Sequence, residues 1–153
     1  MKKPANFPDV NVLALDPGKM SGIAFYSGSG TIQAYEANFY KAAKALEWLI
    51  PMCELVTVER FTIGVNTGKM RDNNWSLELI GVARWYCLKH DVNLLFQGPA
   101  EAKQFMSNDK LKALGLHKAT VGGHQNDAVR HLILALLGYT TWWDPRLASV
   151  LSQ

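Results

Sequence analysis

The chain has 153 residues, of which 48% are hydrophobic and 19% are charged, and its formal net charge is +3. This is the composition of an ordinary globular protein, so we expect a single domain over residues 1–153 with one apolar core. A membrane partner is not expected, because the longest apolar run, residues 132–137, is too short to cross a bilayer. The small positive charge favours an anionic partner only weakly.

The cysteines and the first residues indicate a cytoplasmic protein. Cys53 and Cys87 stand far apart and outside any paired motif, so we expect buried free thiols in a reducing compartment. Lys2 and Lys3 are followed by residues 4–9 (Pro-Ala-Asn-Phe-Pro-Asp), which do not form the apolar segment of a signal peptide.

The hydrophobic pattern predicts a regular alternation of elements. In chain order, these are strands at about residues 11–16, 22–26 and 31–37, a helix at 39–50, a strand at 54–59, a helix at 75–90, a strand at 92–97, short helices at 99–106 and 109–114, and a helix at 124–137. Residues 27–30 (Ser-Gly-Ser-Gly) predict a hairpin turn. The order predicts an α/β domain with a mixed five-stranded sheet flanked by helices.

Two apolar strands each end on a lone carboxylate, Asp16 before a Pro-Gly turn and Glu59 after residues 56–58 (Val-Thr-Val). The last helix opens with His124 and Asp127, three residues apart and therefore on one helical face. Hard divalent cations prefer oxygen ligands, so three clustered carboxylates with a histidine predict a metal site. In a small basic protein, such a site indicates a nuclease.

Each of these residues, taken alone, also has a structural explanation. Asp16 could cap the Asp-Pro-Gly bend, and Glu59 could pair with Arg60 or another surface base. His124 could be a solvated ring at the start of a helix. Asp127 could be an acid in the first turn that interacts favourably with the helix dipole. The order and spacing of all four together favour the metal site.

Two further polar residues lie on the last helix. We expect His131, one turn beyond Asp127, to pack within the apolar part of the helix rather than to serve the site. For Arg130, a phosphate contact and an ion pair with Asp127 are equally good explanations.

At these residues the chain resembles the RuvC family of Holliday junction resolvases, especially its small phage-type members. The matching segments are residues 15–18 (Leu-Asp-Pro-Gly) with 21–22 (Ser-Gly), 58–61 (Val-Glu-Arg-Phe), 76–84 (Ser-Leu-Glu-Leu-Ile-Gly-Val-Ala-Arg), 100–104 (Ala-Glu-Ala-Lys-Gln) and 124–128 (His-Gln-Asn-Asp-Ala). The resemblance implies a ribonuclease H-like fold and a metal-dependent endonuclease of DNA recombination. Such an enzyme cuts four-way and other branched DNA junctions by paired phosphodiester hydrolysis.

The resemblance also implies roles for the site residues and a location. Asp16 would bridge two Mg²⁺ or Mn²⁺ ions, Glu59 would hold one, and Asp127 would hold the other, while His124 would either join Asp127 at its metal or carry a proton instead. Bacterial members often have Asp where His124 stands, although His also occurs there. The segment between Lys103 and His124 is shorter than in bacterial members. A phage-encoded chain would act in the host cytoplasm.

The predicted contacts to branched DNA combine cations with an aromatic ring, since cations neutralise phosphates and a ring stacks on an unpaired base. They are Phe61, Lys69, Arg71, Lys103, Lys110 and Lys118. The first three lie in a long polar loop at residues 61–74, and loops of this length are commonly functional. Lys103 enters through the resemblance, with a solvated helix lysine as its alternative. For Phe61 the alternative is an anchor at the loop end, and for Trp75 the anchor is favoured.

The helix at 75–90 resembles the family's dimer-forming helix, which implies a homodimer. Its apolar residues exceed what one narrow face can bury; they are Leu77, Ile80, Val82, Ala83, Trp85 and Leu88. Two rival functions are another ribonuclease H-like nuclease, acting on RNA or an RNA/DNA hybrid, and a non-catalytic module for branched DNA. The dimer-like helix disfavours the first and the full set of acids disfavours the second. A nucleotide-binding protein of the actin and sugar-kinase type would need two such lobes.

Overall fold

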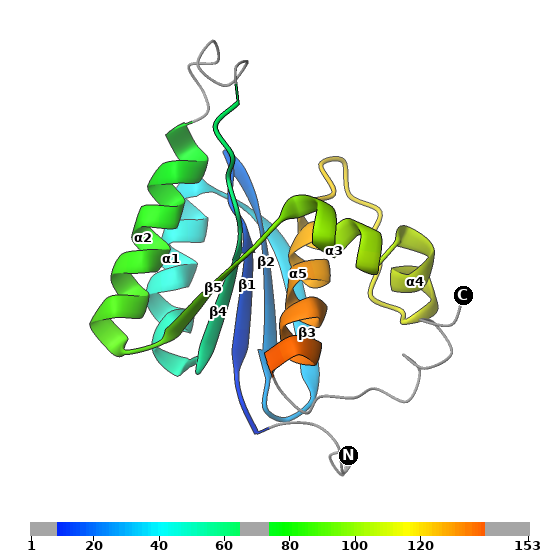
Figure 1. The fold of residues 1–153 in the computed structure, drawn as a ribbon, viewed down its shortest axis with the longest axis horizontal. Helices are drawn as coiled ribbons and strands as arrows, with labels where there is room; N and C mark the ends of the chain where they lie inside the picture. Colours follow the sequence, from blue (N-terminus) through cyan, green and yellow to red (C-terminus); the bar gives the residue numbers. More distant parts are fainter. Residues whose placement is uncertain (1–8, 65–73, 140–153) are drawn as a thin grey trace.

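The computed structural model of the chain describes residues 9–64 and 74–139 (Figure 1). Its elements are β1 (Val12–Asp16), β2 (Met20–Ser27), β3 (Thr31–Asn38), α1 (Phe39–Leu49), the 3₁₀ helix η1 (Ile50–Met52), β4 (Leu55–Glu59), α2 (Asn74–His90), β5 (Asn93–Gln97), α3 (Pro99–Phe105), α4 (Asn108–Ala113) and α5 (His124–Tyr139). All the predicted strands and helices are confirmed, with ends that differ by a few residues.

The strands of the described residues form a five-stranded sheet in the order β3-β2-β1-β4-β5. β1 pairs antiparallel with β2 and parallel with β4, while β5 continues the parallel half. The mixed sheet predicted from the sequence is therefore confirmed, and β1 lies at its centre beside β4. This placement brings the ends of β1 and β4, with their terminal acids, to the same edge of the sheet.

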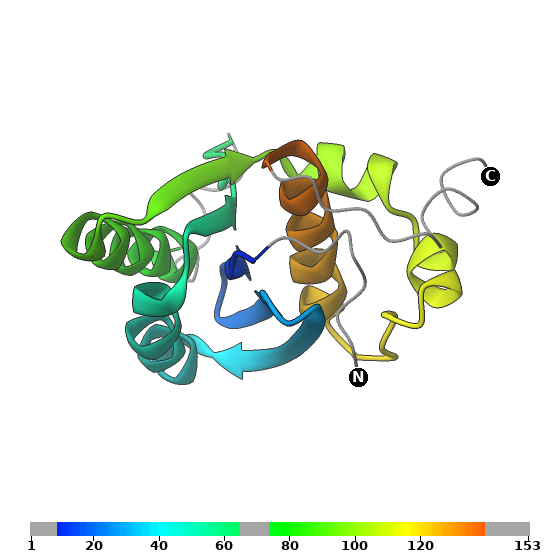
Figure 2. The same cartoon turned by 90° about the horizontal axis from the view of Figure 1, so that it is seen from below.

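Helices cover both faces of the sheet. α1 and α2 lie on one face and α5 on the other, with α3 and α4 beside α5 (Figures 1 and 2). Because successive strand residues point to opposite faces, Leu13 and Leu15 pack toward α1 and α2, whereas Val12 and Ala14 pack toward α5. Burial on both sides explains why β1 is an uninterrupted apolar run up to Asp16.

Several smaller expectations can be compared with the structure. Cys53 and Cys87 are buried free thiols, as predicted, and burial raises their pKa values to about 12 and about 11. Pro51 lies at the start of η1, which explains why α1 ends there. No helix in the described part of the chain is long and apolar enough to cross a membrane. Much of the predicted loop, residues 65–73, lies outside the described residues.

Gly22 determines how closely α5 approaches the sheet. It is buried on β2 directly opposite Asp16, where β2 meets the first turn of α5. A Cβ atom at Gly22 would lie 1.8 Å from the carbonyl oxygen of His124, a contact that no real side chain makes. A glycine here is therefore required for the start of α5 to sit over the end of β1.

Replacing Gly22 tests this close approach. We expect Gly22→Ala to lower the free energy of unfolding by about 3 kcal/mol, because backbone must move to admit the methyl group. The control is Gly138→Ala near the end of α5, where an added Cβ meets nothing within 4 Å. That control should be neutral or stabilise by up to about 1 kcal/mol, since Ala favours a helix. Equal urea-denaturation midpoints for the two variants would contradict the packing argument.

Candidate active site

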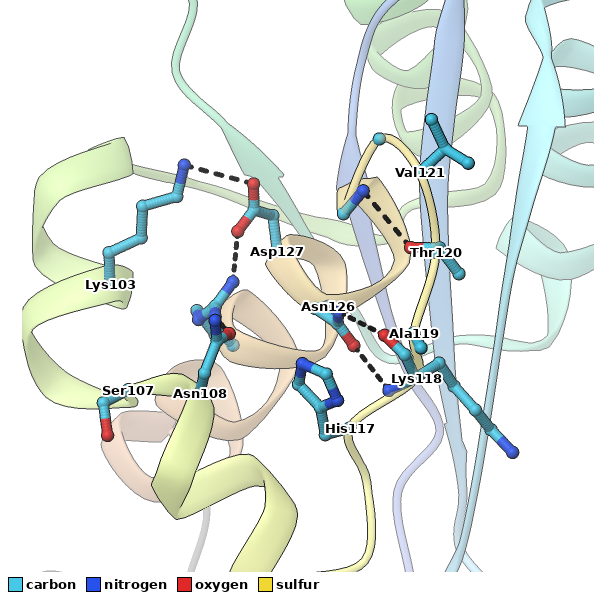
Figure 3. Close-up of a pocket in the computed structure, with 13 residues that line it drawn as sticks. Lys103, Ser107, Asn108, His117, Lys118, Ala119, Thr120, Val121, Asn126 and Asp127 are labelled. Atoms are coloured by element: carbon cyan, nitrogen blue, oxygen red, sulfur yellow. Dashed lines mark hydrogen bonds and ion pairs between the residues drawn. The ribbon is translucent and has the colours of Figure 1, made fainter.

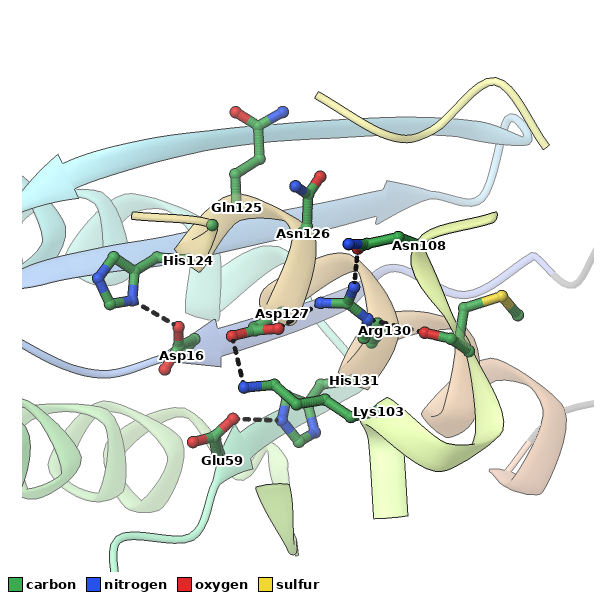
Figure 4. Close-up of polar contacts among 12 residues, drawn as sticks. Asp16, Glu59, Lys103, Asn108, His124, Gln125, Asn126, Asp127, Arg130 and His131 are labelled. Carbon is green, nitrogen blue, oxygen red and sulfur yellow. Dashed lines mark hydrogen bonds and ion pairs between the residues drawn. The ribbon is translucent and has the colours of Figure 1, made fainter. Parts of the chain in front are cut away.

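Three elements bring acidic side chains together at one edge of the sheet (Figure 4). Asp16 ends β1 and Glu59 ends β4, and the pairing of Leu15 with Val58 places these acids side by side. Both side chains point to the α5 face, because they continue the alternation that buries Ala14 and Leu55 there. α5 begins at the same edge with His124 and reaches Asp127 in its first turn.

Asp16 is the most buried of the three acids, with 7% of its surface exposed. Its Oδ2 lies 2.9 Å from Nδ1 of His124. The pKa of Asp16 is raised to about 6, mainly by burial and then by the charge of Glu59, while the hydrogen bond to His124 opposes the shift. The charge of Asp127 adds a smaller upward contribution.

Glu59 is held by a histidine that the sequence analysis assigned to packing. The fully buried His131 contacts Oε2 of Glu59 through Nε2, at 2.8 Å, and Oε1 of Gln97 through Nδ1, also at 2.8 Å. The prediction that His131 only packs among apolar residues is therefore wrong. Residues 124, 127 and 131 follow the i, i+3, i+7 spacing of one helical face, and this spacing was the available signal.

Asp127 contacts two basic side chains. Arg130 donates to its Oδ1, and Nζ of Lys103 lies 3.2 Å from its Oδ2. Arg130 is itself buried and donates to the carbonyl of Met106 and to Asn108 on α4. The ion pair between Arg130 and Asp127, one of the two explanations offered for this arginine, is confirmed.

The donor set fits a divalent metal ion, although the side chains are not arranged around one. Within the described residues, no three His, Cys, Asp or Glu side chains surround a common point that could hold a metal. Each carboxylate contacts a base instead, as Figure 4 shows. No described residue contacts Oδ1 of Asp16 or Oε1 of Glu59, so each acid keeps one oxygen for a cation. A hard cation would also relieve the repulsion that raises the pKa of Asp16.

A polar pocket of about 490 Å³ lies next to Asp127 (Figure 3). Lys103 and Asn108 line one wall, and the segment from His117 to Gly123 lines the other. The amide of Asn126 fixes this second wall, because it accepts from the backbone N–H of Lys118 and donates to the carbonyl of the same residue.

The pocket contains both signs of charge, with cations in excess. Its acid, Asp127, is already paired with Lys103 and Arg130, which leaves Lys118 as an exposed cation at the rim. The pocket is therefore suited to an anionic ligand.

The other predicted DNA contacts have different surroundings. Lys110 is half-buried on α4 and does not line the pocket, and Lys69 and Arg71 lie outside the described residues. Phe61 is half-buried against the core of the α1 and α2 face, which agrees with an anchoring role. Trp75 packs edge-on against Phe39, with ring centroids 4.9 Å apart, as expected for an anchor.

Comparison with solved structures identifies the fold. The chain is similar to RuvC of Thermus thermophilus, with 18% sequence identity and a TM-score of 0.57 over 84% of this chain and 96% of that one. It is also similar to T. thermophilus RuvC in complex with a Holliday junction substrate, with 16% identity and a TM-score of 0.55 over 80% and 89% of the two chains. No protein-family model and no curated protein matches the sequence.

The chain is thus an α/β protein whose mixed five-stranded sheet is flanked by helices in the ribonuclease H-like arrangement. More particularly, its fold is RuvC-like, as the sequence resemblance predicted.

The burial of Asp16 leads to a prediction about stability. The pKa of about 6 in the folded protein exceeds the ordinary 3.8, so the folded state binds the proton more tightly than the unfolded chain does. Stability should therefore fall as pH rises from about 4 to above 6. We expect Asp16→Asn to stabilise the metal-free protein at pH 7.5 by up to about 3 kcal/mol, and the gain should vanish near pH 4.

Urea denaturation in EDTA at the two pH values measures this difference. A matched control is Asp109→Asn, which removes an exposed acid from α4. If Asp16 were a turn-capping residue, its replacement would destabilise the protein at pH 7.5.

Proposed function

We propose that the chain is a metal-dependent endonuclease that cuts four-way and other branched DNA junctions by phosphodiester hydrolysis. The observation that carries this proposal is the convergence of Asp16, Glu59 and Asp127 from three elements at one edge of a RuvC-like sheet. The raised pKa of Asp16 supports it, because carboxyl groups whose ionisation is disfavoured by burial and a neighbouring charge cluster at functional sites. The similarity to a RuvC bound to a Holliday junction substrate supports the choice of DNA.

Mg²⁺ or Mn²⁺, bound as a pair, would supply a water activated for attack and would neutralise charge on the scissile phosphate. Asp16 and Glu59 would bind this pair through the oxygens that contact no other described residue. His131 holds Glu59 in a fixed orientation, and Gln97 orients His131 in turn. His124, which is partly exposed, can either join the ligands or carry a proton near the reacting oxygens.

The pocket beside Asp127 is proposed to receive the backbone of the cut strand. Lys103 and Lys118 line it from opposite walls, and each could turn its exposed side chain to a phosphate. Asn126 holds the backbone of Lys118 in place, so the fold fixes the point from which this side chain extends. Lys110, Lys69 and Arg71 remain proposed contacts that no geometry here supports.

A homodimer through α2 is proposed from the apolar side chains that this helix exposes. Ile80 and Ala83 are buried, but Leu77, Trp85 and Leu88 are 43%, 61% and 77% exposed. Leu77, Gly81 and Leu88 follow the i, i+4, i+11 spacing of one helical stripe. Gly81 in the middle of the stripe would allow a second helix to approach closely, as an added Cβ there meets nothing within 4 Å. Two sites related by a two-fold axis would cut paired strands.

Cleavage assays test the proposed reaction. We expect the protein to cut four-way junctions with Mg²⁺ or Mn²⁺, to cut linear duplex far less, and to be inactive in EDTA. Asp16→Asn should lower the cleavage rate by roughly three orders of magnitude, while junction binding in EDTA persists, since binding rests on phosphate contacts. Asp109→Asn, at the exposed acid of α4, should cleave normally. Cleavage by Asp16→Asn within tenfold of the wild-type rate would contradict the metal site.

The arms of this assay also separate the rivals. Binding of junctions without cleavage in either metal would favour the non-catalytic module. Faster cleavage of an RNA/DNA hybrid than of a junction would favour a different nuclease of the same fold.

The dimer is tested by Gly81→Gln. A side chain at this position should fit the monomer and even stabilise α2, because glycine disfavours a helix by about 1 kcal/mol. The same side chain would stand in the middle of the proposed interface. We expect a dimer for the wild-type protein by light scattering at micromolar concentration, and a folded monomer with an unchanged circular dichroism spectrum for Gly81→Gln. A wild-type monomer would count against paired incision.

A further inference from the structure

The two carboxylate oxygens of Asp127 are held in very different ways. Oδ1 accepts from Arg130, whose side chain is 9% exposed and is anchored in turn by Asn108 and by the carbonyl of Met106, 2.7 Å from Nε. Oδ2 contacts only Lys103 among the described residues, at 3.2 Å, and the side chain of Lys103 is 56% exposed. Figure 4 shows the lysine reaching over the site from α3.

This difference leaves one atom of Asp127 for a metal. Exchanging the partner of Oδ1 would break a buried network that ties α5 to α4, whereas exchanging the partner of Oδ2 would only release an exposed lysine. An ammonium group and a divalent cation cannot share Oδ2, because like charges at such short range repel strongly. The ammonium group of Lys103 therefore occupies the side of Oδ2 that a bound metal ion would need.

Lys103 also has an alternative partner close by. It lines the same pocket as Lys118 and His117, and this pocket is suited to anions. A phosphate placed there would offer Lys103 a second negative group within reach of its long side chain. The exposed pair with Asp127 is weak enough to be displaced, since such pairs contribute about 1 kcal/mol or less.

We propose that Lys103 competes with the metal for Oδ2 of Asp127 and is drawn away by a phosphate of the bound DNA. This inference rests on the proposed nuclease function and adds a coupling to it. Without DNA, Lys103 lowers the metal affinity of the site, and with DNA it neutralises a phosphate and frees the ligand atom. By linkage, metal binding then strengthens DNA binding by the same factor. The metal site is completed only where a phosphate is present to be cut.

The first measurement is Mn²⁺ affinity of the DNA-free protein, followed by the electron paramagnetic resonance signal of free Mn²⁺. We expect Lys103→Met to bind Mn²⁺ about three- to tenfold more tightly than wild type at constant ionic strength. The matched control is Lys112→Met, because Lys112 is 60% exposed and forms a similar pair, 3.3 Å long, with Asp109. Its Mn²⁺ affinity should equal that of the wild type.

The second measurement is the affinity for a four-way junction in Ca²⁺, used as a cation that limits cleavage, relative to the affinity in EDTA. Lys103→Met loses a phosphate contact under both conditions. The ratio of junction affinity in Ca²⁺ to that in EDTA therefore reports only the coupling between metal and DNA binding. We expect Ca²⁺ to strengthen junction binding less in Lys103→Met than in wild type. The deficit should match the factor gained in Ca²⁺ affinity of the DNA-free protein, measured by competition with Mn²⁺, because reciprocity holds for one and the same cation.

Equal Mn²⁺ affinities for wild type and Lys103→Met would overturn the inference while leaving the nuclease proposal intact. An equal gain for Lys112→Met would also overturn it, because the effect would then be one of net charge alone. If none of the three proteins binds Mn²⁺, the proposed function fails and this inference fails with it.

Discussion

The burial of neighbouring carboxylates at one edge of the sheet is the constraint on which the rest of the site depends. Asp16 and Glu59 end adjacent parallel strands, and Asp127 begins the helix above them, so the fold itself forces the acids together. The raised pKa of Asp16 reflects this placement, first through burial and then through the charge of Glu59. The chain answers with a base for every acid, and the positions of those bases determine how rigid each acid is.

The bases differ in burial, and this difference separates permanent contacts from exchangeable ones. His131 is fully buried and Arg130 nearly so, and both are tied down by further hydrogen bonds. They fix Glu59 and one oxygen of Asp127 in place. His124 and Lys103 have 37% and 56% of their side chains exposed and can leave at little cost. The site thus combines a rigid inner layer with an outer layer that a cation can replace.

The sequence predicted the sheet and its terminal acids because both follow from local patterns. An apolar run that ends on Asp16 or Glu59 can be seen in the chain, and so can the helical spacing of His124 and Asp127. The helical spacing also carried a signal for Arg130 and His131, but the partners that come from other elements could not be predicted in the same way. Gln97 and Lys103 reach the site from β5 and α3, and contacts between distant segments leave no periodic signal. Gly22 shows the same limit, since its role depends on where α5 crosses β2.

The same reasoning explains why the fold is evident while the sequence matches no family model. Most of the core needs only apolar side chains of suitable volume, and many sequences satisfy that condition. The contacts of α1 and α2 with their face of the sheet need only such apolar side chains. The α5 face is specified more tightly, because Gly22 must lack a side chain and Arg130 must reach both Asp127 and α4. A few specific residues on the α5 face therefore determine the chemistry of the site. The core on the α1 and α2 face accepts many apolar residues and supports the sheet that carries them.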